Sequence, residues 1–336
     1  MRRTLLLAIV FAGAFAGGCT SGPTVAHNLV GSDLPLRRIA DVPLPGRPNR
    51  LDYQSLDATR HRLFIAHMGD SSVVVVDTQR RRVIAEIPGI GTVTGILAVP
   101  ERHTVYASAT ASNELVAIDE DTLRIVSRTP AGDFPDGISF DPVEQRLYVS
   151  DERGGTLTVI DVRTARRIAT IALGGEVGNN QYDPVSRHIF ANVQARGVLV
   201  EIDPRTNAVV KRFPTTGCVG NHGLLIDARA RRAFVACEDN GAFLWFDMRT
   251  MKIEGTWQVG ADPDVLALDT KTRRLYLAAE SGIVSIFDVG ATVRRLAQGY
   301  LAAGAHTVAV DSANGQVYFP LANVDGTPLL RIMQPR

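Results

Sequence analysis

RLYVSDERGGTLTVID, residues 146–161, is the stretch of sequence that decides the fold. A short apolar run around Tyr148 is followed by a polar loop and then by a second run that ends in Asp161. Short runs that are rich in β-branched residues and bounded by turn residues are typical of β-strands. The stretch therefore predicts two neighbouring strands joined by a loop.

The same pattern recurs along the chain at intervals of 42 or 44 residues. The aromatic position is filled by Phe64, Tyr106, Tyr148, Phe190, Phe234, Tyr276 and Tyr318. The aspartates that close the following strand are Asp77, Asp119, Asp161, Asp203, Asp247 and Asp288. The aspartates of the turn before the aromatic strand are Asp57, Asp141, Asp183, Asp227, Asp269 and Asp311. Turn aspartates hydrogen-bond to nearby backbone, so we interpret both aspartate series as structural.

Each unit is predicted to contain four short strands, which is the number of strands in a β-propeller blade. The sequence therefore predicts an all-β protein with seven four-stranded blades over residues 36–336. The seventh unit, from His306 to Met333, lacks a fourth strand. The segment LRRIADVPL, residues 36–44, precedes the first unit and has the pattern of that missing strand. We expect it to complete the last blade, because closing the ring removes two open sheet edges.

Residues 146–150 (RLYVS), followed by Val159, Ile160 and Asp161, resemble the YVTN-repeat, or YncE-like, β-propeller family. The resemblance covers residues 36–336 and recurs in all seven units. It implies a periplasmic or surface-attached binding protein or scaffold, and no single chemistry, since function belongs to a site rather than to a fold.

Residues 1–18 have the features of a signal peptide, because Arg2 and Arg3 precede an apolar run from Leu5 to Phe15. This run is shorter than the roughly 20 residues that a membrane helix needs. We therefore expect export, to the periplasm or the cell surface.

Small residues before Cys19 resemble a bacterial lipobox, in which the cysteine becomes lipidated. Ala16 replaces the usual leucine of that motif, so ordinary signal cleavage is the alternative. We expect residues 19–35 to form a lipidated cysteine and a tether, with membrane contact through the lipid anchor only. Thr20 after Cys19 favours the outer membrane over the inner one, by analogy with enteric lipoproteins.

Two further cysteines, Cys218 and Cys237, form an even pair in a chain expected to be exported. Such a pair predicts a disulfide, because the compartment is oxidising. Two buried thiols, or a pair of copper-binding thiols, are the alternatives. Covalent haem is not expected, since the attachment motif Cys-x-x-Cys-His is missing from the sequence.

The repeat also aligns the loops that surround the mouth of the central channel. Five residues before each turn aspartate, the chain carries Asp52, Thr94, Asp136, Gly178, His222, Asp264 and His306. Four residues after each aromatic, it carries Met68, Thr110, Glu152, Gln194, Glu238, Glu280 and Ala322. Symmetry predicts that these side chains converge on one face, with Arg50, Asn179, Asn180, Asn221 and His67 nearby.

Carboxylates and imidazoles that converge in this way are suitable ligands for Ca²⁺, Mn²⁺ or Zn²⁺. We predict a metal site at Asp52, Asp136, His222, Asp264 and His306. We predict cofactor or ligand contacts from Asn179, Asn180, Asn221, Glu238 and Glu280. The alternative is that these polar groups cap loop backbone at the channel mouth.

Two functions fit this pattern. The first is an exported, monomeric lipoprotein that binds a small ligand or a protein partner at the channel-mouth face, as a scaffold or accessory. The second is a metal-dependent hydrolase of the lactonase type, in which the ring holds the cation. The sequence does not decide whether the chain is an enzyme. A net charge of +1 gives no electrostatic footprint for nucleic acid.

Overall fold

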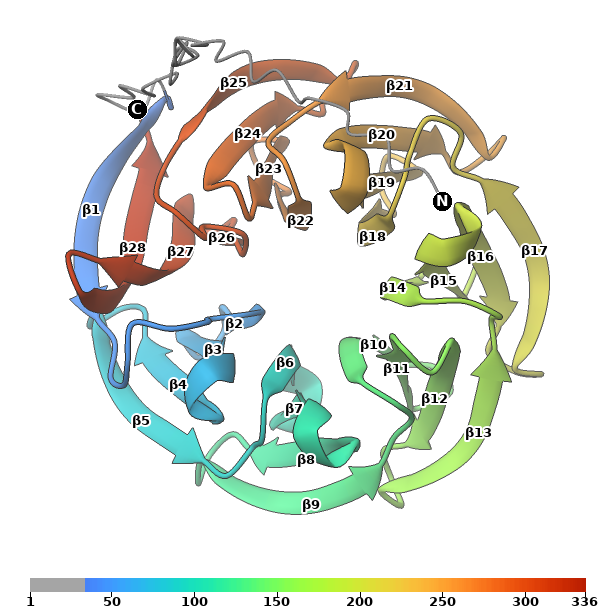
Figure 1. Cartoon of the computed structure of the whole chain (residues 1–336), viewed down its shortest axis with the longest axis horizontal. Helices are drawn as coiled ribbons and strands as arrows, with labels where there is room; N and C mark the ends of the chain where they lie inside the picture. Colours follow the sequence, from blue (N-terminus) through green and yellow to red (C-terminus); the bar gives the residue numbers. More distant parts are fainter. Residues whose placement is uncertain (1–33) are drawn as a thin grey trace, which may run out of the picture. The chain divides into compact units, whose positions relative to one another are not determined.

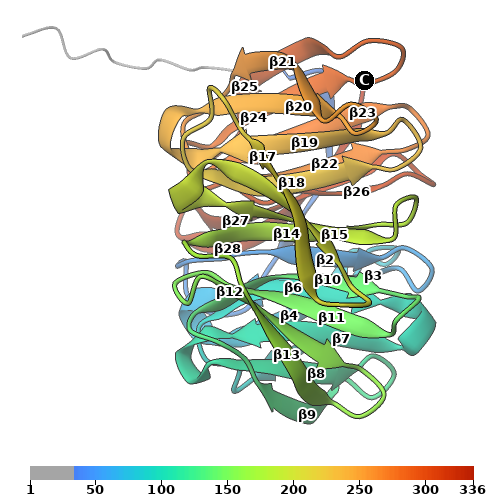
Figure 2. The ribbon, with the colours of Figure 1, turned by 90° about the vertical axis from the view of Figure 1, so that its right-hand side faces the viewer.

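The computed structural model describes residues 34–336, and these residues form seven four-stranded antiparallel sheets arranged around one central axis (Figure 1). The sheets are stacked side by side around the ring, as the perpendicular view in Figure 2 shows. The predicted seven-bladed propeller is confirmed. The predicted signal peptide and the lipidated Cys19 lie outside the described residues and stay predictions.

The strands of each blade occupy equivalent positions from the axis outward. The innermost strands are β2 (Gln54–Asp57), β6 (Val93–Val99), β10 (Pro135–Asp141), β14 (Val177–Asp183), β18 (Asn221–Asp227), β22 (Pro263–Asp269) and β26 (Ala309–Asp311). The second strands are β3 (Arg62–His67), β7 (Thr104–Ala109), β11 (Arg146–Asp151), β15 (His188–Val193), β19 (Arg232–Cys237), β23 (Arg274–Ala279) and β27 (Gln316–Val324).

The outer half of each blade repeats in the same way. The third strands are β4 (Ser72–Asp77), β8 (Glu114–Asp119), β12 (Thr156–Asp161), β16 (Val198–Asp203), β20 (Ala242–Asp247), β24 (Ile283–Asp288) and β28 (Thr327–Pro335). The outermost strands are β5 (Arg82–Pro88), β9 (Arg124–Pro130), β13 (Arg166–Ala172), β17 (Ala208–Pro214), β21 (Lys252–Gln258), β25 (Arg294–Tyr300) and β1 (Leu36–Pro43). Short 3-10 helices follow five of the second or innermost strands: η1 (Met68–Asp70), η2 (Pro100–Arg102), η3 (Thr110–Ser112), η4 (Gln194–Arg196) and η5 (Glu238–Asn240).

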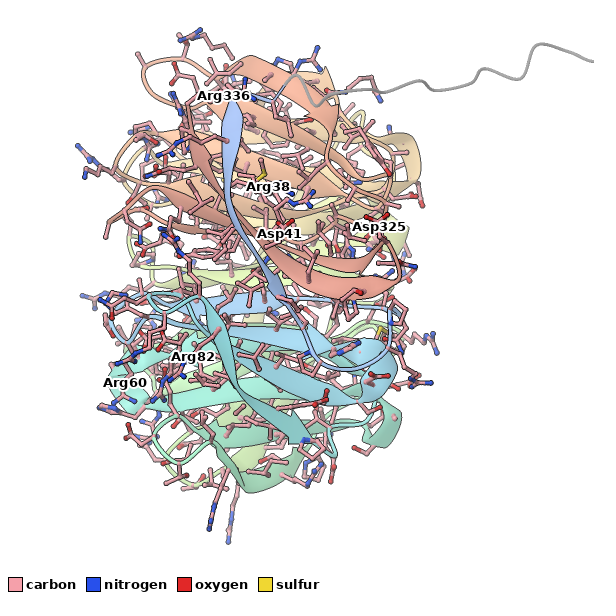
Figure 3. The ribbon with its side chains drawn as sticks, turned by 90° about the vertical axis from the view of Figure 1, so that its left-hand side faces the viewer. Arg38, Asp41, Arg60, Arg82, Asp325 and Arg336 are labelled. Carbon is pink, nitrogen blue, oxygen red and sulfur yellow. A yellow bond between two sulfur atoms is a disulfide. The ribbon has the colours of Figure 1, made fainter. Side chains whose placement is uncertain are left out.

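The seventh blade is closed by both ends of the described chain. Strand β1 pairs antiparallel with β28, with Leu36 opposite Pro335, so the sheet order is β1-β28-β27-β26. On the outer side of this blade, Arg331 donates two hydrogen bonds of 2.9 and 2.8 Å to the carboxylate of Asp41, which is labelled in Figure 3. The predicted completion of the last blade by the N-terminal strand is confirmed.

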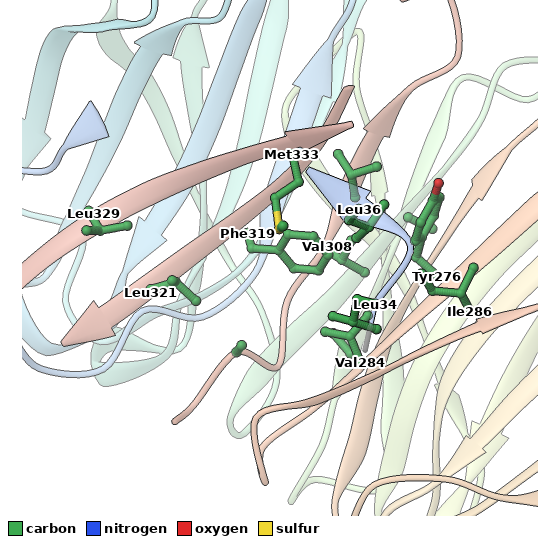
Figure 4. Close-up of a cluster of buried hydrophobic side chains, with 14 residues drawn as sticks. Leu34, Leu36, Tyr276, Val284, Ile286, Val308, Phe319, Leu321, Leu329 and Met333 are labelled. Carbon is green, nitrogen blue, oxygen red and sulfur yellow. The ribbon is translucent and has the colours of Figure 1, made fainter. Parts of the chain in front are cut away.

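The hydrophobic core consists of wedges that lie between neighbouring blades. Phe64 of the first blade shares one cluster with Val105 and Val116 of the second blade. The cluster in Figure 4 joins the sixth and seventh blades, and in it Leu34 and Leu36 are buried with Tyr276. The aromatic series of the sequence is therefore the packing surface between blades, which accounts for its strict period.

The turn aspartates hold backbone amides, as predicted for both series. Asp141 accepts a 2.8 Å hydrogen bond from the amide of Val143, and Asp161 accepts one of 2.8 Å from the amide of Arg163. Each aspartate thereby fixes the tight turn that reverses the chain at one end of the blade.

No helix of the described residues is long and apolar enough to cross a membrane.

Candidate functional site at the channel mouth

A β-bulge at the start of an innermost strand positions the aligned channel-mouth residue in five of the blades. In β10, Pro135 pairs with Asp151 and Ile138 with Val149, so Asp136 and its neighbour fall outside the regular register. Equivalent register shifts occur at Val93/Ile96, Val177/Asn180, Asn221/Leu224 and Pro263/Leu266. Bulges re-aim side chains, and these shifts occur at the position where the sequence predicts the channel-mouth ring.

The predicted ring residues are all buried. The exposed fractions of Asp52, Asp136, His222, Asp264 and His306 are between 3% and 6%. Buried charged groups require partners. The structure brings these residues together in two separate groups rather than in one ring.

The first group surrounds His222. Its Nε2 atom lies 3.7 Å from Oδ1 of Asp264 and 3.8 Å from Oδ2 of Asp136. Its Nδ1 atom lies 3.7 Å from Oε1 of Glu238 and also contacts the amide of Gln194. Each of the two nitrogen atoms of the imidazole therefore faces at least one carboxylate.

Tyr53 connects this group to the first blade. Its hydroxyl lies 2.9 Å from Nε2 of His222 and donates a 3.1 Å hydrogen bond to Oδ1 of Asp264. The side-chain amide of Asn179 donates a 2.9 Å hydrogen bond to the same hydroxyl. Side chains from four blades thus meet at one phenolic oxygen.

The second group contains its own cations. Nε2 of His306 lies 3.3 Å from Oδ1 of Asp52, and Nδ1 lies 3.4 Å from Oε2 of Glu280. Arg50 contacts the same two carboxylates, at 3.1 Å from Asp52 and 2.5 Å from Glu280. Two acids are therefore matched by a guanidinium and an imidazole.

In both groups, neighbouring carboxylates raise the pKa of the buried histidine. Burial disfavours the charged imidazole of His222, but the carboxylates of Glu238, Asp264, Asp136 and Glu152 outweigh this and raise its pKa to about 9. Burial raises the pKa of Glu238 to about 7 and also raises the pKa of Asp136 and of Asp264. The first group thus combines one imidazole with four carboxyl groups and contains no guanidinium among its described contacts.

One triad in the first group meets the geometric requirement for a metal site. His222, Glu238 and Asp264 each offer a ligand atom, and these atoms lie within 4.8 Å of one another. Zinc ligands at about 2.0–2.2 Å from the ion stand roughly 3.4 Å apart in a tetrahedron, close to the observed 3.7 Å. Glu238 and Asp264 lie beside different ring nitrogens, so a single ion requires one of these carboxylates to rotate.

The other predicted contacts are distributed unevenly. Asn179 lies at the axis with Tyr53. Asn180 instead donates to Gly137 O at 3.0 Å, and Asn221 donates to Val198 O at 2.9 Å. These two amides hold backbone, which is the capping alternative that the sequence left open.

His67 also lies away from both groups. It is fully buried in the first blade, where its Nε2 atom lies 2.7 Å from Asn49 Oδ1 and 3.7 Å from Asp70 Oδ2. Among the described residues, His67 makes no contact with His222 or His306. The sequence prediction that His67 could reach the rim of the channel mouth is therefore not supported by a contact.

The two predicted disulfide cysteines are bonded. Cys218 and Cys237 are joined by an S–S bond, with their Cα atoms 5.4 Å apart. The bridge links the loop that enters the fifth blade to the end of β19, opposite Asn221 in the register. It therefore fixes the loop that carries His222.

A cavity of about 440 Å³ extends along the axis behind the His222 group. Tyr53, Asn179 and Asp264 line one end, and Leu97 and Leu266 are among the apolar residues of its wall. Tyr53 therefore belongs both to the polar mouth and to the lining of the cavity.

Tyr53 is the residue that sequence reasoning missed. The position after each aligned channel-mouth residue is glycine at Gly95, Gly137 and Gly223, whereas the first blade carries Tyr53 and the fourth carries Asn179. A Cβ atom at Gly95 would lie 2.0 Å from Asp136 O, so neighbouring blades approach closely there. A large side chain at that small-residue position was the available signal.

Comparisons with known proteins support the fold alone. No protein-family model matches the chain. No curated protein matches it by sequence. Among solved structures, the chain is similar to Kuenenia stuttgartiensis hydrazine synthase, with a TM-score of 0.74 over 83% of this chain and 94% of that chain. At 16% identity, this similarity concerns the seven-bladed propeller and not its chemistry.

Proposed function

We propose that this chain is an exported binding propeller that holds a divalent cation at His222, Glu238 and Asp264. The contrast between the two buried groups carries the proposal. Arg50 and His306 both contact Asp52 and Glu280, whereas the four carboxyl groups around His222 have no other cationic side chain within 4 Å among the described residues and are influenced by His306 and Arg153 only at longer range. Buried like charges are costly unless a cation compensates them.

The donor set favours a transition-metal ion over Ca²⁺. One imidazole nitrogen with two or three carboxylate oxygens is suitable for Zn²⁺ or Mn²⁺, whereas Ca²⁺ takes six to eight oxygen ligands. Asp136, at 3.8 Å from the imidazole, is the available fourth protein ligand. If the ion leaves Asp136 free, the fourth position is open to water or to a bound molecule.

Export is supported by two independent features. Residues 1–18 have the signal-peptide pattern, and the Cys218–Cys237 disulfide belongs to oxidising compartments. The lipid anchor at Cys19, the outer-membrane location and membership of the YVTN-repeat family belong to the same proposal.

The test is elemental analysis of the full-length chain purified without chelator, followed by titration calorimetry with Zn²⁺, Mn²⁺ and Ca²⁺. We expect close to one equivalent of bound ion in the parent and in His306→Gln, and loss of at least tenfold in affinity in His222→Gln. Each variant removes one imidazole, His222→Gln from the first group and His306→Gln from the second, so each variant is the matched control of the other. Absence of binding in the folded parent, or equal loss in both variants, would overturn the assignment to His222.

Hydrolysis by the bound cation is a second candidate, because Asp264 lines the axial cavity as well as the triad. A lactone that entered the cavity would approach the ion from that side, and the ion would polarise its carbonyl. Turnover of a lactone series by the metal-loaded parent, and none by His222→Gln, is the expected result for this candidate. Metal-loaded protein without turnover would leave binding as the function.

A further inference from the structure

The axial cavity has the properties of a small-molecule site. Its volume of about 440 Å³ falls in the range of roughly 300–1,000 Å³ that is typical of ligand pockets. It runs along the innermost strands, from Tyr53 and Asp264 near their starts to Pro142 and Pro184 just past the ends of β10 and β14. Its lining combines apolar side chains with polar ones, among them Ser139, Gln181 and Glu101, and such a mixture is compatible with a small-molecule site.

The polar end of the cavity is rich in acceptors. Asp264 is 5% exposed, and the Tyr53 hydroxyl donates to its Oδ1 atom. Within residues 34–336, no side chain or amide donates a hydrogen bond to Oδ2 of Asp264 or to Oδ1 of Asn179. Both oxygens are accessible from the cavity, so a donor group of a ligand can take the place of the water that would otherwise bind there.

The donors at this end are already used. The amide nitrogen of Asn179 donates to Tyr53, and the hydroxyl of Tyr53 donates to Asp264. An anionic head group would therefore meet acceptors and a carboxylate, which repel it. A primary ammonium has three donors and no acceptor, and its positive charge complements Asp264.

We propose that the axial cavity binds a small primary amine with a compact apolar body, its ammonium placed between Asp264 and Asn179. The apolar body lies along Leu97, Ile138 and Leu266, which line the wall. Near the far end the cavity is also lined by Phe140 and Tyr182, which accommodate an aromatic ring. The site is distinct from the metal site except for Asp264, so an amine and a divalent ion compete for that carboxylate.

The probe is 2-phenylethylamine, compared with 2-phenylethanol, which has nearly the same shape but a neutral head. Binding is measured by calorimetry on full-length, chelator-treated protein, so the result does not depend on the metal. We expect the parent to bind the amine at least about tenfold more tightly than the alcohol, because charge-assisted hydrogen bonds exceed neutral ones by that much. Asp264→Asn should abolish this preference.

The matched control is Asp262→Asn, which removes an exposed carboxylate two residues earlier in the same loop. It should keep the preference for the amine. Leu97→Trp, which fills the cavity away from Asp264, should weaken both probes, and circular dichroism confirms folding of each variant. Equal binding of the two probes by the parent, no saturable amine binding, or unchanged binding in Leu97→Trp would overturn the proposal. Added Zn²⁺ should displace the amine; amine binding in a protein that takes up no metal would separate this inference from the proposed function.

Discussion

The hydroxyl of Tyr53 lies 2.9 Å from Nε2 of His222, although the two residues are 169 positions apart and belong to the first and fifth blades. The contact crosses the propeller axis. It joins the polar mouth, where the carboxylates gather around His222, to the axial cavity whose end Tyr53 forms. A single phenol therefore lines the cavity and contacts the imidazole.

Replacing Tyr53 by phenylalanine should destabilise the metal-free protein by about 1–3 kcal/mol, because the change leaves Asn179 and Asp264 without their partner. Urea unfolding monitored by circular dichroism measures the loss. Tyr106→Phe is the control, since no hydrogen bond of the Tyr106 hydroxyl is found within the described residues, and it should change stability by less than about 0.5 kcal/mol. Equal effects of the two substitutions would contradict the role given to Tyr53.

The repeat predicted the fold well because each of its positions has one physical task. The aromatic series packs between blades and the aspartate series hold turn amides, so both keep the period of the blades. The last blade and the disulfide also followed from the sequence, since ring closure and an even cysteine pair leave few alternatives.

The division of the channel mouth could not be predicted, because it depends on which side chains reach one another across the axis. Arg50 lies two residues before the aligned position and has no place in the repeat, yet it contacts both Asp52 and Glu280. Likewise, Asn180 and Asn221 stand in register with the site but turn toward backbone carbonyls. The symmetry of the repeat predicts at which level along the propeller axis a residue lies, but it does not predict the direction in which the side chain points.

Stability of the metal-free protein should fall as the pH rises from about 6.5 to about 9. Burial opposes protonation of His222, but Glu238 and Asp264 outweigh it and raise the pKa of the imidazole from its ordinary 6.5 to about 9. Because the folded state then binds this proton more tightly than the unfolded chain, the stabilisation is fully present below about pH 6.5 and lost through about pH 9. The loss due to His222 should reach about 3 kcal/mol at most, and Glu238, whose pKa is raised to about 7, adds to the decline mainly below about pH 7.

Urea unfolding of chelator-treated protein between pH 6 and pH 9.5 tests this dependence. His222→Gln should flatten the decline, because glutamine does not titrate. A parent whose stability stays constant across this range, or a variant that declines in parallel with it, would show that His222 is not held protonated by its neighbours.

Replacing both Cys218 and Cys237 by serine should cost about 3 kcal/mol of stability. The bridge closes a segment of 19 residues, and a cross-link of this length removes chain entropy of that order from the unfolded state. Thermal unfolding of the variant is compared with that of the parent in reductant, and the two should agree. A variant as stable as the oxidised parent would show that the bridge does not constrain the loop that carries His222.

Gly223→Ala should destabilise the protein by at least about 2–3 kcal/mol and weaken metal binding. A Cβ atom at this position would lie 2.0 Å from the carbonyl oxygen of Asp264, which is backbone and cannot rotate away. The sixth blade would have to move outward, and Asp264 would move with it away from His222. Gly154→Ala is the control, because the nearest neighbour of a Cβ atom there would lie at 3.3 Å. The free energy of unfolding of this variant should be within about 1 kcal/mol of that of the parent. If Gly223→Ala matched this control in both stability and metal affinity, the close approach of the blades would not be what positions Asp264.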